Sequence, residues 1–142
     1  MKEVTKVLLY IFRRNEGRIE FFVQHNRDGF NNVLSGHVGD NIIGETFEAA
    51  ARRETVEELG VEAISVTNLE HKEIVTLKRW NKLSTEWAFL IEIPNKDVHY
   101  LDSDEKHSWV TLGQLEDALT FPNHKSAVPK ILNRFGLTKK SH

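Results

Sequence analysis

The sequence predicts one domain that combines strands and helices, of the α+β or α/β class. The chain has 142 residues, of which 39% are hydrophobic and 28% charged, as expected for a folded domain with one buried core. Segments rich in β-branched and aromatic residues occur near the N-terminus and in the middle of the chain, whereas residues 47–59 consist mainly of strong helix formers. We therefore expect residues 1–142 to form a single domain.

The first third of the chain is expected to form a β-hairpin followed by a loop. Residues 4–12 are β-branched and aromatic, and Asn15-Glu16-Gly17 provides a turn before a second strand over residues 19–24. After a polar loop, Val33-Leu34 leads into residues 35–41, a stretch punctuated by glycine. We interpret this stretch as a strand that leads into a site loop.

A helix is predicted over Phe47–Leu59, because this segment is built largely from alanine, glutamate, arginine and leucine. Thr46 stands where an N-cap is needed, and Gly60 stands where a helix is expected to end. The two flanking residues therefore define both ends of the predicted helix.

Strands are predicted to dominate the middle of the chain. Residues 63–69, 73–78 and 86–93 have strand composition, with a turn at Asn81-Lys82 and a stop at Pro94. This order, strands on both sides of a helix, supports a mixed fold class.

The C-terminal part is predicted to contain a short apolar segment and two helices. The apolar segment is Trp109-Val110, and Thr111 with Gln114 forms a capping-box pattern for a helix that ends at Leu119. The second helix begins near Pro129 or is kinked there, and Gly136 ends it.

Composition excludes several classes of function. The chain has 19 basic and 21 acidic residues, a net charge of −2, and no basic run longer than Lys139-Lys140, so a nucleic-acid-binding protein is not expected. It has no cysteine, which excludes disulfides and thiolate metal sites and fits the cytoplasm. The apolar run Val7–Phe12 is too short to span a membrane. We expect a cytoplasmic protein that binds a small ligand.

The acidic residues of the predicted helix are crowded in a way that calls for a cation. Glu54 and Glu58 are four residues apart with Glu57 between them, and Glu57 and Glu58 stand at the negative end of the helix dipole. Arg53 alone does not balance the negative charge of three acids, so a bound divalent cation is one explanation of the crowding. The alternative to a bound cation is a solvated helix with scattered charge. Clustered carboxylates without thiolates favour Mg²⁺ or Mn²⁺, ions that also accept substrate phosphates.

The spacing of these residues resembles the signature box of the Nudix hydrolase superfamily. The pattern G-x5-E-x7-R-E-U-x-E-E-x-G-U, in which U is bulky and apolar, is matched by Gly39, Glu45, Arg53, Glu54, Glu57, Glu58 and Gly60. Thr55 departs from the pattern at the first U. The turn that family members carry close to the Gly-Glu pair resembles Ser35-Gly36-His37-Val38, about two residues too far from Gly44-Glu45. We therefore expect Gly36 to hold the structural place of that turn, and its carbonyl, rather than that of Val38, to bind metal.

The resemblance implies roles for the acids of the box. Glu57 and Glu58 become the main ligands of Mg²⁺ or Mn²⁺, and Glu54 becomes a further ligand or the general base. Arg53 becomes the partner that orients Glu54, and Glu45 supports the metal shell.

Residues outside the box complete the site that the resemblance implies. Many family members take another acid from a loop beyond the box, for which Glu105 is our choice, although a solvated acidic turn is the alternative. Arg27 stands where relatives place phosphate-binding arginines, and His37 stands in the site loop. A surface arginine and a histidine with a local hydrogen bond are the alternatives. Trp80 either stacks on a base or serves packing.

The layout of the whole chain looks most like the nucleoside-triphosphate pyrophosphohydrolases, including the bacterial dATP and dihydroneopterin-triphosphate branch. This implies a mixed sheet sandwiched between helices, an α/β/α arrangement, and Mg²⁺-dependent hydrolysis of a nucleoside diphosphate linked to another group. The foremost substrate is a (deoxy)nucleoside triphosphate, cleaved to the monophosphate and pyrophosphate by a monomer or homodimer.

Two alternatives remain open at this point. One is a hydrolase of ADP-ribose or a dinucleoside polyphosphate. The ADP-ribose group typically has a proline some sixteen residues after the box, but none occurs between Gly60 and Pro94, and residues 77–79 stand where the dinucleoside-polyphosphate group often has a tyrosine. The other is a catalytically silent nucleotide-binding sensor, which the retention of every acid in the box disfavours. A relative of isopentenyl-diphosphate isomerase is disfavoured because the chain has no cysteine.

Overall fold

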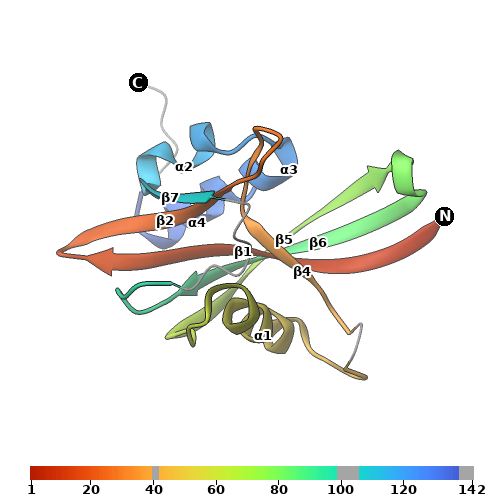
Figure 1. The fold of residues 1–142 in the computed structure, drawn as a ribbon, viewed down its shortest axis with the longest axis horizontal. Coiled ribbons are helices and arrows are strands. Elements are labelled where there is room, and N and C mark those ends of the chain that lie inside the picture. The colour runs from red at the N-terminus through yellow and green to blue at the C-terminus, as the bar shows by residue number, and fades with distance from the viewer. Residues whose placement is uncertain (40–41, 99–105, 138–142) are drawn as a thin grey trace.

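The computed structural model describes residues 1–39, 42–98 and 106–137, and these form three layers (Figure 1). A mixed sheet lies in the middle, α1 covers one face, and α2, α3 and α4 lie on the other. The helices are α1 (Phe47–Leu59), α2 (Leu112–Ala118), α3 (Pro122–Lys125) and α4 (Val128–Arg134). The predicted α/β/α arrangement is confirmed.

The described strands form one sheet in the order β3-β2-β1-β6-β5, with β4 paired to β1 and β7 paired to β2. β1 is the central strand, because it pairs antiparallel with β2 and β4 and parallel with β6. The strands are β1 (Lys2–Asn15), β2 (Arg18–His25), β3 (Asn31–Asn32), β4 (Leu34–His37), β5 (Ser65–Leu77), β6 (Lys82–Glu92) and β7 (Lys106–Thr111).

Helix α1 has the bounds that its flanking residues predict. The Thr46 side chain accepts a hydrogen bond of 3.1 Å from the backbone N–H of Ala49, and Gly60 adopts a left-handed conformation with φ of 70°. Thr55 is fully buried, and its hydroxyl donates a hydrogen bond of 2.8 Å to the Ala51 carbonyl, so its polar atom is satisfied inside the helix. The departure from the apolar pattern at this position therefore leaves no buried polar atom unpaired.

One prediction about element boundaries is wrong, and one short helix was not predicted. The two strands predicted over residues 63–69 and 73–78 are one continuous strand, β5. The register of its pairing with β6 shifts between Asn68 and Lys72, but the strand does not end there. Before the helix that contains Pro129, a separate short helix, α3, occupies Pro122–Lys125. Pro129 stands in the first turn of α4, where it requires no backbone N–H, so the predicted start near this residue is confirmed.

The sheet buries side chains on both of its faces. In β1, Leu8 and Tyr10 belong to the core beneath α2, α3 and α4, whereas Val7 and Leu9 belong to the core beneath α1. This alternation explains why β1 is a continuous apolar run in the sequence. The apolar side of α1 packs on the face that carries Val7 and Leu9, so the polar side of that helix lies at the surface.

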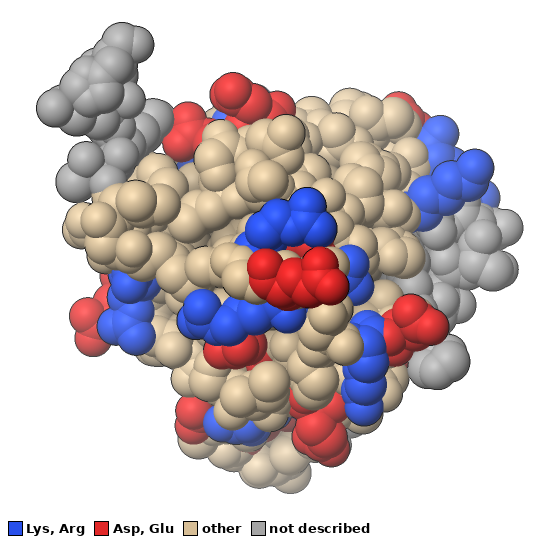
Figure 2. Space-filling view, turned by 90° about the vertical axis from the view of Figure 1, so that its left-hand side faces the viewer, with Lys and Arg blue, Asp and Glu red and all other residues tan. Residues whose placement is uncertain are grey.

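Surface charge and helix length bear on two classes of partner, nucleic acids and membranes. On the face shown in Figure 2, basic and acidic side chains are interspersed and form no extended patch of one sign. Every helix within the described residues is too short or too polar to span a bilayer.

The partly buried side chain of His124 is expected to make the stability of the fold depend on pH. The Tyr10 hydroxyl donates a 2.6 Å hydrogen bond to the His124 carbonyl, and burial, with the nearby charge of Lys6, lowers the pKa of the His124 imidazole to about 4. In the unfolded chain the histidine has its ordinary pKa of about 6.5, so below pH 6.5 the unfolded chain binds a proton that the folded chain does not bind until about pH 4. Stability therefore falls as the pH drops below 6.5.

We expect this histidine to cost about 2 kcal/mol of stability between pH 7.5 and pH 5. Urea unfolding midpoints of the wild type and of His124→Asn at the two pH values measure this effect. The variant should lose less stability on acidification than the wild type. Equal losses in the two proteins would show that His124 does not titrate in this way.

Candidate active site

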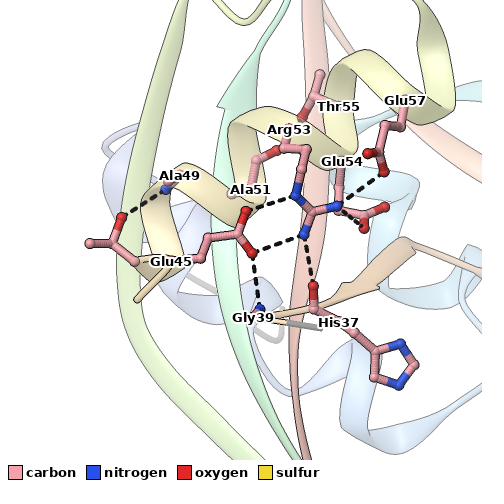
Figure 3. A network of polar contacts seen from close by, with 10 residues as sticks. His37, Gly39, Glu45, Ala49, Ala51, Arg53, Glu54, Thr55 and Glu57 are labelled. Carbon is pink, nitrogen blue, oxygen red and sulfur yellow. Dashed lines mark hydrogen bonds and ion pairs between the residues drawn. The ribbon is translucent and has the colours of Figure 1, made fainter. Parts of the chain in front are cut away.

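Arg53 on α1 gathers three of the acids that the sequence singles out (Figure 3). Its guanidinium donates to both carboxylate oxygens of Glu45, at 2.7 and 3.0 Å. Its Nη1 donates to Glu54 at 2.8 Å and to Glu57 at 3.0 Å, and its Nη2 also donates to the His37 carbonyl at 2.9 Å. One side chain therefore joins the loop, the helix and the end of β4.

The pair between Arg53 and Glu45 fastens the loop before α1 to the helix. The Glu45 side chain is only 3% exposed and also accepts a 3.0 Å hydrogen bond from the backbone N–H of Gly39. The hydrogen bonds from Arg53 and from Gly39 hold the pKa of the Glu45 carboxyl below its usual value, against the effect of burial. Arg53 in turn has its pKa raised, chiefly by Glu45, so both groups stay charged at physiological pH.

Glu54 lies against β4 in a position that only glycine permits. A Cβ atom built on Gly36 would overlap the Glu54 side chain, so the absence of a side chain at this position makes room for the carboxylate. Burial raises the pKa of the Glu54 carboxyl above its usual value, and the neighbouring Arg53 opposes this shift. The carboxylate is therefore close to the backbone of β4 and has a raised affinity for a proton.

The donor atoms at the end of α1 fit a hard divalent cation. Glu54 and Glu57 turn one oxygen each toward the positively charged Nη1 of Arg53, and half-buried Glu58 follows on the same helix. These donors are oxygens only, the type that Mg²⁺ and Mn²⁺ prefer. Within the three described ranges, no group of three acidic or histidine side chains is arranged to enclose an ion.

The structure brings some of the other predicted residues to the site and not others. His37 contributes its carbonyl to the network, while its ring points away from the acids (Figure 3) and lines a separate pocket together with exposed Trp80. Arg27 is exposed in the β2–β3 loop, which lies beside α3 on the side of the sheet away from α1 (Figure 1). Glu105 lies outside the described residues.

Sequence reasoning missed a second group of polar residues, on the sheet face opposite α1. Asn32, Glu86 and His124 line one pocket there, although they are far apart in the sequence. The sequence did contain one signal, Glu86. It is an acid in a strand whose alternate side chains are buried, and an unpaired buried charge is costly. The other two give no sequence signal, because only the fold brings them together.

Comparison with known families decides the identity of the fold. The family model of the NUDIX domain matches residues 3–131. The chain belongs to the NUDIX family. Enzymes of this family generally use divalent metal ions. The signature box and the Arg53 network described above both lie within the matched residues.

Solved structures share this fold at low sequence identity. A Listeria monocytogenes protein assigned to the NUDIX hydrolases has 21% identity, covers 96% of this chain and 99% of its own, and has a TM-score of 0.77. The Ap4A hydrolase of C. elegans has 24% identity, coverage of 94% and 98%, and a TM-score of 0.73. The E. coli dihydroneopterin triphosphate pyrophosphohydrolase has 15% identity, coverage of 94% and 99%, and a TM-score of 0.73. A comparison with curated protein sequences gives no match.

Proposed function

We propose that this Nudix hydrolase cleaves a (deoxy)nucleoside triphosphate to the monophosphate and pyrophosphate, with Mg²⁺ as its preferred ion. The observation that carries the proposal is the Arg53 network, which holds Glu45, Glu54 and Glu57 at the end of β4. Residues 1–142 act as a single domain, as a monomer or homodimer.

The residues have separate roles in this proposal. Glu57 and Glu58 are the main metal ligands, with Glu54 and the Gly36 carbonyl completing the protein's contribution. When bound, the divalent cation neutralises charge on the polyphosphate and lowers the pKa of water for attack on phosphorus. This supply of positive charge matters because the protein itself has a net charge of −2.

Glu54 is the residue suited to accept a proton from the attacking water. Burial raises its pKa toward the range in which a carboxylate works as a general base near neutral pH. Arg53, at 2.8 Å from the Glu54 carboxylate, orients it, and the pair with Glu45 keeps Arg53 in place. Arg53 is thus a positioning residue rather than a group that touches the reacting atoms.

Known relatives act on different diphosphate compounds, so the substrate has to be tested directly. One relative of the same fold is an Ap4A hydrolase and another is a dihydroneopterin triphosphate pyrophosphohydrolase. The choice of a nucleoside triphosphate rests on the layout of the chain and on the second relative's fold, at 15% identity.

A substrate panel with product detection tests the proposal. The panel contains the deoxynucleoside triphosphates, ADP-ribose and diadenosine tetraphosphate, each with Mg²⁺. A triphosphate should give pyrophosphate and monophosphate in equal amounts. EDTA should abolish turnover, and added Mg²⁺ or Mn²⁺ should restore it. Faster turnover of ADP-ribose or of the dinucleotide would overturn the substrate class, and nucleotide binding without turnover would identify a sensor.

A further inference from the structure

A second pocket lies away from the acid cluster, at the end of the sheet beside the last turn of α4. β1 and β6 end there and β5 begins there, and the pocket has a volume of about 220 Å³. Three of these elements place a charged side chain in its lining, and we call it the Arg134 pocket; the three are Arg14, Glu92 and Arg134. Gly36 of the candidate active site pairs with Val7 in β1, seven residues before Arg14. The Arg134 pocket is therefore about 20 Å along β1 from the candidate active site.

The wall of the Arg134 pocket is apolar and belongs to the core. Phe12 and Leu90 line the pocket and are only 4% and 5% exposed. Both are part of the core beneath α2, α3 and α4, so the pocket lies on the face of the sheet that α1 does not cover. Phe135 completes the wall, with its ring edge-on to that of Phe12 at 5.2 Å between the ring centroids. A ligand in the pocket can therefore bury an apolar group against these side chains.

Most polar groups of the Arg134 pocket have no partner in the fold. Among the described residues, Arg134 has no acidic partner, and the hydroxyl groups of Ser65 and Thr67 make no hydrogen bond. Pairing with β6 turns both of these hydroxyl groups to the pocket's face of the sheet. Arg14 donates from Nε to Glu92 at 3.2 Å, which leaves its two Nη groups for other acceptors. The pocket thus offers several donors to a ligand that accepts hydrogen bonds.

Charge and size define the kind of ligand that fits. Arg14 and Arg134 carry two positive charges and Glu92 carries one negative charge, so one negative charge on a ligand makes the pocket neutral. Guanidinium groups bind carboxylates through two parallel N–H groups. The volume of about 220 Å³ is below the roughly 300–1,000 Å³ of pockets for drug-sized molecules, so the ligand is limited to one small ring or a short chain.

We propose that the Arg134 pocket binds a small organic carboxylate, with its apolar body against the wall. The guanidinium group of Arg134 and the Nη groups of Arg14 donate to the carboxylate, and the two hydroxyl groups donate further hydrogen bonds to it. This binding site is independent of the proposed function, because no residue of the candidate active site lines the pocket. A ligand held there contacts α4, β1, β5 and β6 together, so it stabilises the folded chain.

Calorimetry with benzoate tests the proposal, with EDTA present so that no metal ion contributes. Benzoate should bind with a Kd on the order of 1 mM, as expected for a ligand of this size. Benzamide has the same shape without the charge and should bind at least about tenfold more weakly. In about 20 mM benzoate, Tm should rise by about 4 °C relative to sodium chloride of the same ionic strength.

Arg134→Gln is the variant that tests the pocket directly. It should weaken benzoate binding at least about tenfold, because it removes the positive charge that has no acidic partner in the described residues. Arg134 is exposed, so the variant should fold normally, as circular dichroism can verify. Lys130→Gln is the matched control, because Lys130 is exposed one turn earlier on α4 and does not line the pocket. Its Kd for benzoate should stay within about twofold of the wild type.

Three results would overturn the proposal. The first is equal binding of benzoate by the wild type and Arg134→Gln, or equal binding of benzoate and benzamide by the wild type. The second is binding of phenyl phosphate more than about tenfold tighter than that of benzoate, because the pocket would then select a phosphate. The third is loss of benzoate binding in Glu57→Gln, because the ligand would then occupy the candidate active site.

Discussion

Replacing Glu57 with glutamine is expected to lower kcat about a thousandfold while leaving the fold intact. A metal ligand contributes several kcal/mol to the transition state, and about 4 kcal/mol corresponds to this factor. Glutamine keeps the shape of the side chain but loses the negative charge with which we propose that Glu57 holds a divalent ion. The Glu57 side chain is 54% exposed and its bond to Arg53 joins residues four apart in a helix, so its loss should change stability by less than about 0.5 kcal/mol.

Glu48→Gln is the matched control for this change. Glu48 lies on the same helix, is exposed, and forms a weak pair with Arg52 at 3.8 Å, away from the Arg53 network. Its substitution should leave kcat within about twofold of the wild type, as expected for a surface change. Steady-state kinetics and urea unfolding of the three proteins provide the comparison. If Glu57→Gln kept most of its activity, Glu57 would not be a ligand of the catalytic metal.

The sequence was sufficient wherever the signal is local. Thr46 and Gly60 defined α1 because capping depends on residues within one turn of the helix end. The seven residues of the box identified the family because their spacing is itself the signal. The two strands predicted over β5 were wrong because the bulge between Asn68 and Lys72 is stabilised by pairing with β6, which a local pattern does not contain.

Contacts between distant segments could not be predicted in the same way. The sequence indicated that Arg53 orients Glu54, but not that it also binds Glu45 and the His37 carbonyl, 8 and 16 residues away. These contacts depend on how the loop and β4 fold against α1. The pocket on the sheet face opposite α1 depends on residues still farther apart in the sequence, because its lining extends from Lys6 in β1 to His124 in α3.

Gly36→Ala is expected to disrupt the site from the opposite side, by displacing Glu54. The added methyl group would overlap the Glu54 side chain, so the carboxylate has to leave its place beside Arg53. We expect kcat to fall on the order of 100-fold, as for a misplaced catalytic group, and stability to fall by about 1–3 kcal/mol from overpacking. Steady-state kinetics and urea unfolding measure the two effects.

Gly113→Ala provides the control, because a Cβ at Gly113 in α2 meets no atom within 4 Å. It should keep full activity and gain up to about 1 kcal/mol, since alanine is the better helix former. A double-mutant cycle then tests the cause. If the overlap with Glu54 is responsible, adding Gly36→Ala to Glu54→Ala should cost little further stability, because the side chain that it displaces is gone. Additive losses would instead locate the damage in the backbone of β4.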